Sequence, residues 1–337
     1  MLEKQRNYTM YLPVYVAAVL IYLLAAIIQP RFLTWNNNVN LFTRIVPLMF
    51  AGIAQIFVLL TGGIDLSVGA VIGLTNVVAA SLPKVGTGLN IVLWFVVPLL
   101  IGATIGLING IIISRWGFPP FIVTFATSTI WTGVALFIMD VPGGEVSFSL
   151  YKAIAGKLFG IIPIPLLIII AFVIITYIIL QKTVFGRSIY AVGGNKQVAR
   201  ESGINVERIE LLAYLTSGVY AAFGGMYLSA IMISGDPLVG DPYVMNSIAV
   251  AVIGGVALSG GRGGVQGIIG GVYIFYLLDN ILNLVGVSTF YQYVAKGLVI
   301  ILALALTSKE HTFNINLKFN FLNKLKFLKQ KQLDEEV

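Results

Sequence analysis

Ten apolar stretches, each about long enough to cross a bilayer, follow one another along this 337-residue chain. An α-helix needs roughly 20 apolar residues to span the hydrocarbon core, and breaks rich in glycine, proline, asparagine or charge separate the stretches. Hydrophobic residues make up 58% of the chain and charged residues only 10%, which is too few charges for a water-soluble globule. The sequence therefore predicts an all-α, polytopic membrane protein with about ten transmembrane helices. The stretches lie at 11–29, 41–61, 65–82, 91–113, 121–139, 161–180, 209–233, 244–258, 265–285 and 289–306.

The first stretch, 11–29, has two interpretations. Lys4 and Arg6 precede it, as basic residues precede a secretory signal sequence. A signal core, however, is about 7–15 residues long and ends at a small-residue cleavage site. This stretch is longer and closes with Gln-Pro-Arg-Phe at 29–32, so the sequence favours a retained helix.

Lysine and arginine are concentrated in the head (1–10), the interior loop 181–208 and the tail (307–337). Basic segments stay on the cytoplasmic side of a membrane, so all three are predicted to be cytoplasmic. Six stretches precede the loop and four follow it, and both even numbers return the chain to the same side. We therefore expect a transmembrane domain over 11–306 with both termini in the cytoplasm.

Several kinds of chemistry are excluded by composition. The chain has no cysteine, and its one histidine, His311, lies outside every apolar stretch. Disulfides, thiol catalysis and a histidine-rich metal centre are therefore not expected. We predict no catalytic residue and no metal site.

The segment Ala257–Gly264 contains Leu-Ser-Gly-Gly, which is typical of the signature sequence of ATP-binding cassettes. A nucleotide hydrolase also needs a phosphate-binding loop. The one Gly-Lys pair, Gly156-Lys157, lacks that loop's upstream glycine and its hydroxyl residue. We interpret 257–264 as a tight cytoplasmic turn and expect any ATP hydrolysis to come from another chain.

The segment Thr61–Ser67 interrupts two apolar stretches with paired glycines and a carboxylate, Asp65. In hydrocarbon such a break is tolerated only where it faces protein or water. Asp65 could line a polar pathway, or Asp65 and Ser67 could cap the helix that follows. Both roles can coexist.

Neutral polar residues recur inside the stretches. Each one alone most often bonds to its own helix or to a neighbouring helix. Together they suit the passage of a polar, uncharged solute better than a proton relay, which needs a chain of ionisable groups. Asp279 and Lys296 could form an ion pair, but the sequence does not place them side by side. The candidates for a pathway are Asp65, Ser67, Thr75, Asn76, Thr124, Thr127, Asn246, Asn280 and Asn283.

Glycines spaced by four residues predict close contacts between helices. Gly102, Gly106 and Gly110 form one such set, and Gly69 and Gly73 form another. Small residues at this spacing let helix backbones approach each other in a membrane. We expect a tightly packed bundle.

The interior loop carries its own local pattern. Gly193-Gly194-Asn195 can form a turn and a helix cap, residues 196–202 can form two helical turns, and Gly203 can end them. A short exposed helix of this kind suits docking onto another protein, and a solvated connector is the equal alternative. The tail segment 317–331 alternates lysines with leucine and phenylalanine, which predicts a basic amphipathic segment on the anionic membrane surface in preference to a nucleic-acid contact.

Five motifs in order resemble the permease subunit of ribose-type sugar ABC importers. The similarity covers residues 40–306 and leaves out the head and the tail. The motifs are Gly62–Gly69 (GGIDLSVG), Phe121–Thr124 (FIVT), Phe185–Arg187 with Gly193–Asn195 and Ser202–Ile204 (FGR, GGN and SGI), Val252–Gly255 with Leu258–Gly263 (VIGG and LSGGRG), and Lys296–Leu298 (KGL).

The resemblance implies the ABC importer permease fold, with two permease chains, identical or paralogous, forming the pathway in a bacterial cytoplasmic (inner) membrane. A cytoplasmic ABC ATPase would use the ATP, so that this chain binds no cofactor, and an extracytoplasmic binding protein would deliver the solute. Nucleic acid is not an expected partner. Relatives carry ribose, xylose, arabinose, galactosides or autoinducer-2, so the solute stays open. In this family the short loop helix couples to the ATPase, which makes the coupling candidates Gly194, Asn195, Ala199, Ser202 and Gly203.

A second class of function stays open from the residues alone, namely an ion-coupled secondary transporter or channel. It would need its own ion site. Asp65, Asp279 and Lys296 are the formal charges best placed to form one.

Overall fold

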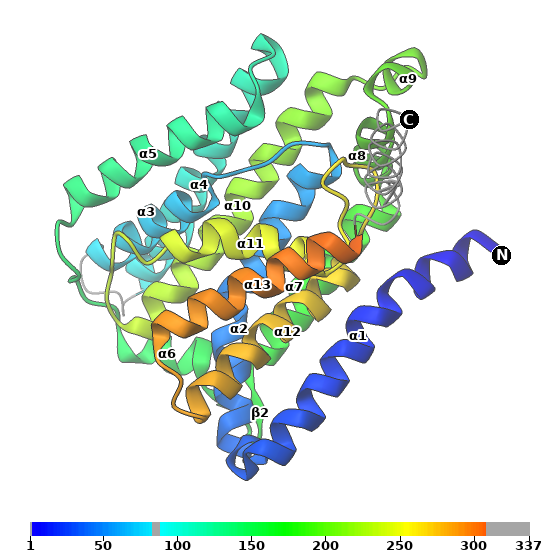
Figure 1. The fold of residues 1–337 in the computed structure, drawn as a ribbon. Coiled ribbons are helices and arrows are strands. Elements are labelled where there is room, and N and C mark those ends of the chain that lie inside the picture. The colour runs from blue at the N-terminus through cyan, green and yellow to red at the C-terminus, as the bar shows by residue number, and fades with distance from the viewer. Residues whose placement is uncertain (1, 83–87, 308–337) are drawn as a thin grey trace, which may run out of the picture.

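The computed structural model describes residues 2–82 and 88–307. The described chain is mostly helical, as predicted, and its helices form one bundle (Figure 1). The helices are α1 (Leu2–Ile28), α2 (Trp35–Leu60), α3 (Val68–Ser81), α4 (Gly88–Trp116), α5 (Pro120–Ile138), α6 (Phe148–Ala155), α7 (Ile164–Lys182), α8 (Val184–Gly194), α9 (Lys196–Glu201), α10 (Val206–Met232), α11 (Asp241–Ile253), α12 (Val265–Leu284) and α13 (Thr289–Thr307).

Each of the ten apolar stretches falls on a helix, and seven of these helices are long and apolar enough to span a membrane within the described residues. The helices α3 and α11 are apolar but shorter, with 14 and 13 residues. The first helix begins at Leu2, well before the apolar stretch that predicted it. The predicted amphipathic tail segment, 317–331, lies outside the described residues.

Five short elements were not predicted. One is the 3₁₀ helix η1 (Pro30–Leu33), between α1 and α2. The loop between α5 and α7 contains the short helix α6 and a hairpin of two strands, β1 (Lys157–Leu158) and β2 (Ile162–Pro163). The fifth is α8, in which Gly193 and Gly194 are the last two helical residues and not the expected turn. These elements are short and carry no long apolar run, which was the signal that located the other helices.

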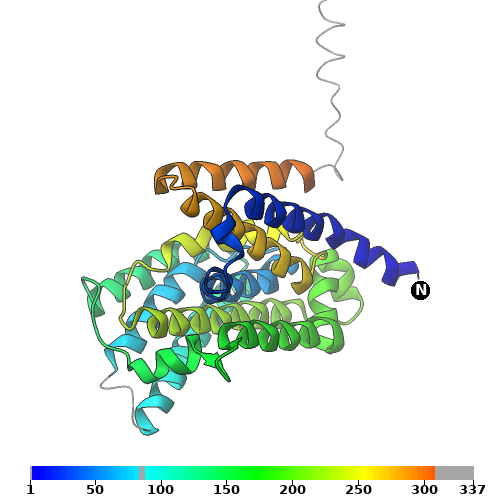
Figure 2. The same ribbon diagram turned by 90° about the horizontal axis from the view of Figure 1, so that it is seen from below.

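The centre of the bundle is α2. Every residue from Ile45 to Leu60 is buried, as expected of a helix that is apolar on all sides. The helices α10, α11, α12 and α7 pack around it, and α1 and α13 lie at the edge, next to α12 (Figure 2). The edge helices expose many large apolar side chains, as helices that face lipid do.

Glycine contacts set the distance between α4 and α10. A side chain added at Gly106 would meet the backbone of Tyr214 and Leu215, and one added at Gly102 would meet the backbone of Gly218. The close approach predicted from the glycine spacing is therefore confirmed for this helix pair. It fixes α10 firmly against α4.

Loops that are far apart in sequence meet at one end of the bundle. Gly143 and Gly235 exchange two backbone hydrogen bonds of 2.9 and 2.7 Å, and the N–H of Glu145 donates to the carbonyl of Ala80 (3.1 Å). These contacts join the loops that follow α5 and α10 to the last turn of α3. In the ten-span arrangement predicted from the sequence, both of these loops lie on the side opposite to the loop 181–208.

We predict that Gly106→Val destabilises the protein, because the added side chain overlaps the α10 backbone. Overpacking of this kind costs about 1–3 kcal/mol, and it should lower the thermal unfolding temperature in detergent. Gly133→Val is the matched control, since a Cβ added at Gly133 on α5 would meet no atom within 4 Å. Equal unfolding temperatures for the two variants would contradict the close packing.

Candidate functional site

The break between α2 and α3 lies inside the bundle. Gly62 has a φ of +82°, and the chain then runs without helical structure to Leu66. The Thr61 hydroxyl donates to the carbonyl of Val58 (2.7 Å), and so does the N–H of Gly63 (3.1 Å). The break therefore obtains hydrogen-bond partners from the protein, as a non-helical segment at membrane depth requires.

Asp65 is the centre of a buried polar cluster. Its Oδ1 accepts hydrogen bonds from the N–H of Ser67 (2.9 Å) and the Ser67 hydroxyl (2.6 Å). Its Oδ2 accepts from the Ser217 hydroxyl on α10 (2.8 Å), and Asn109 on α4 donates to the Ser67 oxygen (2.9 Å). None of these four side chains is more than 2% exposed. Three donors thus satisfy the carboxylate, and two further helices hold it in place.

The structure modifies the predicted helix cap. Ser67 is the N-cap residue of α3, but its side chain accepts no hydrogen bond from the helix. The Asp65 carboxylate instead receives the N–H of Ser67 itself, which fixes the turn immediately before the helix. Asp65 therefore braces the break, and its predicted place along a pathway stays a prediction.

Four more pathway candidates lie on α3 and on the neighbouring helix α5. Thr75 donates to Val71 of its own helix (2.6 Å). Asn76 joins α3 to α10 and to the loop that follows α10. It donates to the carbonyl of Gly225 (3.4 Å) and accepts from the N–H of Asp236 (2.7 Å). On α5 the Thr124 hydroxyl lies 2.8 Å from the carbonyl of Pro120 and 3.3 Å from that of Ile64, and the Thr127 hydroxyl donates to the carbonyl of Thr124 (3.2 Å). Asn76 and Thr124 thus connect separate segments, whereas Thr75 and Thr127 bond within their own helices.

The remaining candidates lie elsewhere in the bundle. Asn280 on α12 exchanges two amide hydrogen bonds with Asn37 on α2 (3.2 and 3.0 Å). Asn283 accepts from Gln292 on α13 (3.1 Å), and Asn246 is half-buried on α11. The sequence therefore suggested one set of polar residues, whereas the structure divides it into an Asp65 group and a group along α12.

Asp279 and Lys296 form the ion pair that the sequence left open. The Lys296 ammonium lies 2.8 Å from Oδ1 of Asp279, and both side chains are 18% exposed. The same ammonium lies over the rings of Phe275 (5.1 Å) and Tyr293 (5.7 Å), close enough for cation–π contacts. The pair joins α12 to α13.

The short helix of the interior loop is confirmed as α9. Oδ1 of Asn195 accepts from the N–H groups of Gln197 (2.9 Å) and Val198 (3.1 Å), so Asn195 caps the helix. Gly203, with a φ of +80°, follows its end. Ala199 is 3% exposed and faces the protein, while the other helical residues of α9 are exposed.

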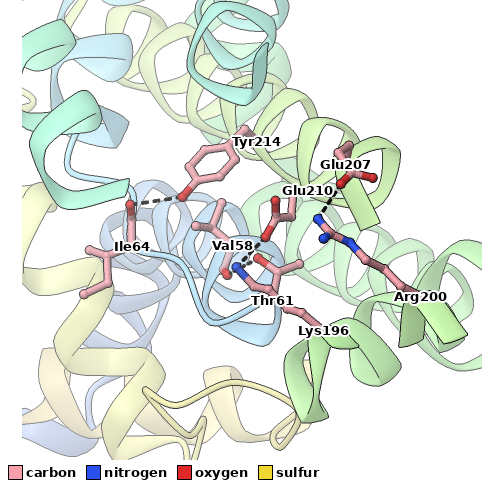
Figure 3. A network of polar contacts seen from close by, with 8 residues as sticks. All are labelled: Val58, Thr61, Ile64, Lys196, Arg200, Glu207, Glu210 and Tyr214. Atoms are coloured by element: carbon pink, nitrogen blue, oxygen red, sulfur yellow. Dashed lines mark hydrogen bonds and ion pairs between the residues drawn. The ribbon is translucent and has the colours of Figure 1, made fainter. Parts of the chain in front are cut away.

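Two ion pairs hold α9 against the start of α10 (Figure 3). The Lys196 ammonium lies 2.6 Å from Glu210, and Arg200 pairs with Glu207. Among the coupling candidates, Gly194 and Ser202 are exposed on either side of α9. The sequence analysis missed Val198, whose side chain is 55% exposed at the middle of α9, because one apolar residue in a polar loop gives no periodic signal.

The segment Ala257–Gly264 forms the predicted turn, between α11 and α12. Gly260 and Gly261 have φ values of +87° and +72°, which glycine adopts without strain. The N–H of Gly261 donates to the carbonyl of Leu60 at the end of α2 (3.0 Å), and Tyr190 of α8 donates to the carbonyl of Gly263 (2.8 Å). The ends of α2, α8 and α11 therefore meet at this turn.

Metal binding has no support in the part of the chain that the structure describes. No group of three or more aspartate, glutamate or histidine side chains there is arranged to hold an ion.

The sequence matches the family described as branched-chain amino acid transport system / permease component over residues 37–304. Since this is most of its length, the chain belongs to that family of transport permeases. It is 37% identical over 291 residues to the ribose import permease protein RbsC of Bacillus subtilis (strain 168), covering 86% of this chain and 89% of that protein.

Two further relatives are also import permeases. The galactose/methyl galactoside import permease protein MglC of Escherichia coli (strain K12) is 36% identical over 316 residues, with 87% of this chain and 93% of the relative covered. The D-allose transport system permease protein AlsC of the same organism is 33% identical over 293 residues, with 87% and 89% covered. No solved structure matches. The resemblance inferred from the five motifs is thus confirmed, and the chain is a multi-pass membrane transport subunit.

We predict that Asp65→Ala destabilises the protein and impairs transport. The change leaves the Ser67 N–H and the Ser67 and Ser217 hydroxyls without their acceptor, and each unpaired buried group costs about 1–3 kcal/mol. Asp65→Asn should be milder, because the amide keeps one acceptor oxygen and can donate to Ser217. Thermal unfolding in detergent checks the order, with Asp140→Ala at an exposed carboxylate as control. A normal unfolding temperature for Asp65→Ala would show that the cluster is dispensable.

Proposed function

We propose that this chain is the permease subunit of an ATP-driven importer and forms the pathway for a monosaccharide or sugar-like solute. The observation that carries the proposal is its similarity, over about nine-tenths of each relative's length, to permeases named for ribose, galactose or methyl galactoside, and allose. Because these relatives differ in solute, the particular sugar stays open.

A separate ATPase chain supplies the energy in this proposal. The Gly156-Lys157 pair lies at the start of the hairpin strand β1, which is no phosphate-binding loop. The Leu-Ser-Gly-Gly sequence forms an interhelical turn whose backbone is bonded to α2. Both observations favour ATP use by a partner, with no cofactor on this chain.

We infer a ten-pass arrangement in a bacterial inner membrane, with the head, the loop 181–208 and the tail in the cytoplasm. The loop contacts support it. The ends of α2, α8 and α11 meet at one end of the bundle, and the last turn of α3 meets the loops after α5 and α10 at the other. In a ten-pass chain the first set is cytoplasmic and the second external.

The two short helices fit this arrangement as broken crossings. At 1.5 Å per residue, α3 and α11 are about 20 Å long, less than the roughly 30 Å of the hydrocarbon core. The break 61–67 and the turn 254–264 lead into and out of them and complete the crossing. Both are hydrogen-bonded within the protein, which is the condition for non-helical backbone in a membrane.

The exposed face of α9 is the proposed docking surface for the ATPase. ATP binding would close the ATPase dimer and displace α9, and the bundle would then shift between outward-open and inward-open states. A second permease chain would complete the pathway, and an external binding protein would deliver the sugar. Because the binding protein selects the sugar, the permease needs only weak contacts with it. The separation of the polar residues into an Asp65 group and a group along α12 agrees with this.

The ion-coupled alternative loses support from the structure. Lys296 neutralises Asp279, and three hydrogen-bond donors satisfy Asp65. Of the three charges that suggested an ion site, none is left both charged and unpartnered.

We predict that the chain co-purifies in mild detergent with an ABC ATPase encoded beside it, and that Val198→Glu abolishes this association. A new carboxylate at the centre of the α9 face would be desolvated by docking, and we expect recovery of the ATPase to fall by about tenfold or more. Val141→Glu is the matched control, because Val141 is also exposed but lies on the opposite end of the bundle. Purification of the unmodified chain without any ATPase would contradict the proposal.

A further inference from the structure

One face of α10 carries a polar stripe that runs from the cytoplasmic loop into the bundle. Glu207, Glu210, Tyr214 and Ser217 follow one another at intervals of three, four and three residues. This spacing places them on the same side of the helix. At 1.5 Å per residue the stripe is about 15 Å long. Every member contacts one of two structures that lie far apart in sequence.

The first end of the stripe holds α9. Lys196 and Arg200 lie one turn apart on α9 and pair with Glu210 and Glu207 on α10. The two ion pairs differ in burial. The Arg200 and Glu207 side chains are 60% and 42% exposed, so this pair contributes little, whereas the Glu210 side chain is only 10% exposed. A largely buried carboxylate is costly to leave without its cation, which makes Lys196–Glu210 the stronger tie.

The second end of the stripe holds the break between α2 and α3. The Tyr214 hydroxyl donates to the carbonyl of Ile64 (3.4 Å), and the Ser217 hydroxyl donates to Oδ2 of Asp65 (2.8 Å). Tyr214 is 1% exposed and Ser217 is fully buried. Figure 3 shows Glu210 directed toward Lys196 and Tyr214 directed toward Ile64, from the same helix.

The helix between these ends is held as a rigid body. Its backbone is in close contact with Gly102 and Gly106 of α4, and it also packs on α2 and α3. This packing restricts bending of α10, so a displacement of α9 can reach the break through the tie between α9 and α10.

We propose that Lys196 and Glu210 are positioning residues, which fix α9 to α10 so that displacement of α9 moves the Asp65 break. The proposal rests on the function given above, because it assumes that a partner moves α9. It adds the element through which that movement enters the membrane domain. An allosteric claim of this kind needs a measured coupling between the two parts, and not their proximity alone.

The test compares Lys196→Met with the exchange variant Lys196→Glu/Glu210→Lys in vesicles that contain the ATPase and are supplied with the loaded binding protein. The measured quantity is sugar imported per ATP hydrolysed, together with recovery of the ATPase on purification. We expect Lys196→Met to keep the ATPase bound but to lower import per ATP by about fivefold or more. The exchange variant restores the pair with reversed charges, so import per ATP should return toward the original value.

Lys157→Met is the matched control, since it makes the same chemical change at an exposed lysine on β1, away from α9. It should leave import per ATP unchanged. Unchanged import per ATP in Lys196→Met overturns the inference, and so does a loss that the exchange variant does not restore, which would assign Lys196 to the ATPase contact instead. If the unmodified chain shows neither ATPase binding nor ATP-dependent import, the proposed function itself has failed.

Discussion

A backbone that leaves the helix inside a bilayer must find its hydrogen-bond partners within the protein, and the Asp65 break shows how this chain does so. The carboxylate draws together the N–H and hydroxyl of Ser67 and the hydroxyl of Ser217, and Asn109 joins through the Ser67 oxygen. Helices α3, α4 and α10 are thereby placed around one charge. The central helix α2, buried from Ile45 to Leu60, ends at this break, so its position also depends on it.

The same constraint explains why three separate parts of the chain meet at the end of α2. The turn between α11 and α12 is a second non-helical segment, and it takes its partner from the last carbonyl of α2 and from Tyr190. Glycines at 193, 260 and 261 let these backbones touch. The result is one junction in which α8 contacts the last residue of α2 and the turn 257–264, and α9 is tied through α10 to the Asp65 break. A partner that moves α9 would act next to the two segments of the membrane domain that are least like regular helix.

Local chemistry and long apolar runs made most of the helices predictable. The ten stretches located ten helices because a membrane span needs many apolar residues in succession, and α9 followed from Asn195 and Gly203 because a cap is a local interaction. The partners were not predictable. Ser217 lies 152 positions from Asp65, and no pattern around either residue points to the other. For the same reason the sequence named Asp279 and Lys296 without pairing them, and grouped polar residues that the structure separates.

The central claim is that this chain is a pathway driven by a partner's ATP. The most direct measurement is uptake of labelled sugar by vesicles that contain the permease and its ATPase, with loaded binding protein outside and ATP inside. The account predicts uptake that requires ATP and persists when ionophores collapse every ion gradient. Uptake by the permease alone, driven by an ion gradient and indifferent to ATP, would contradict it.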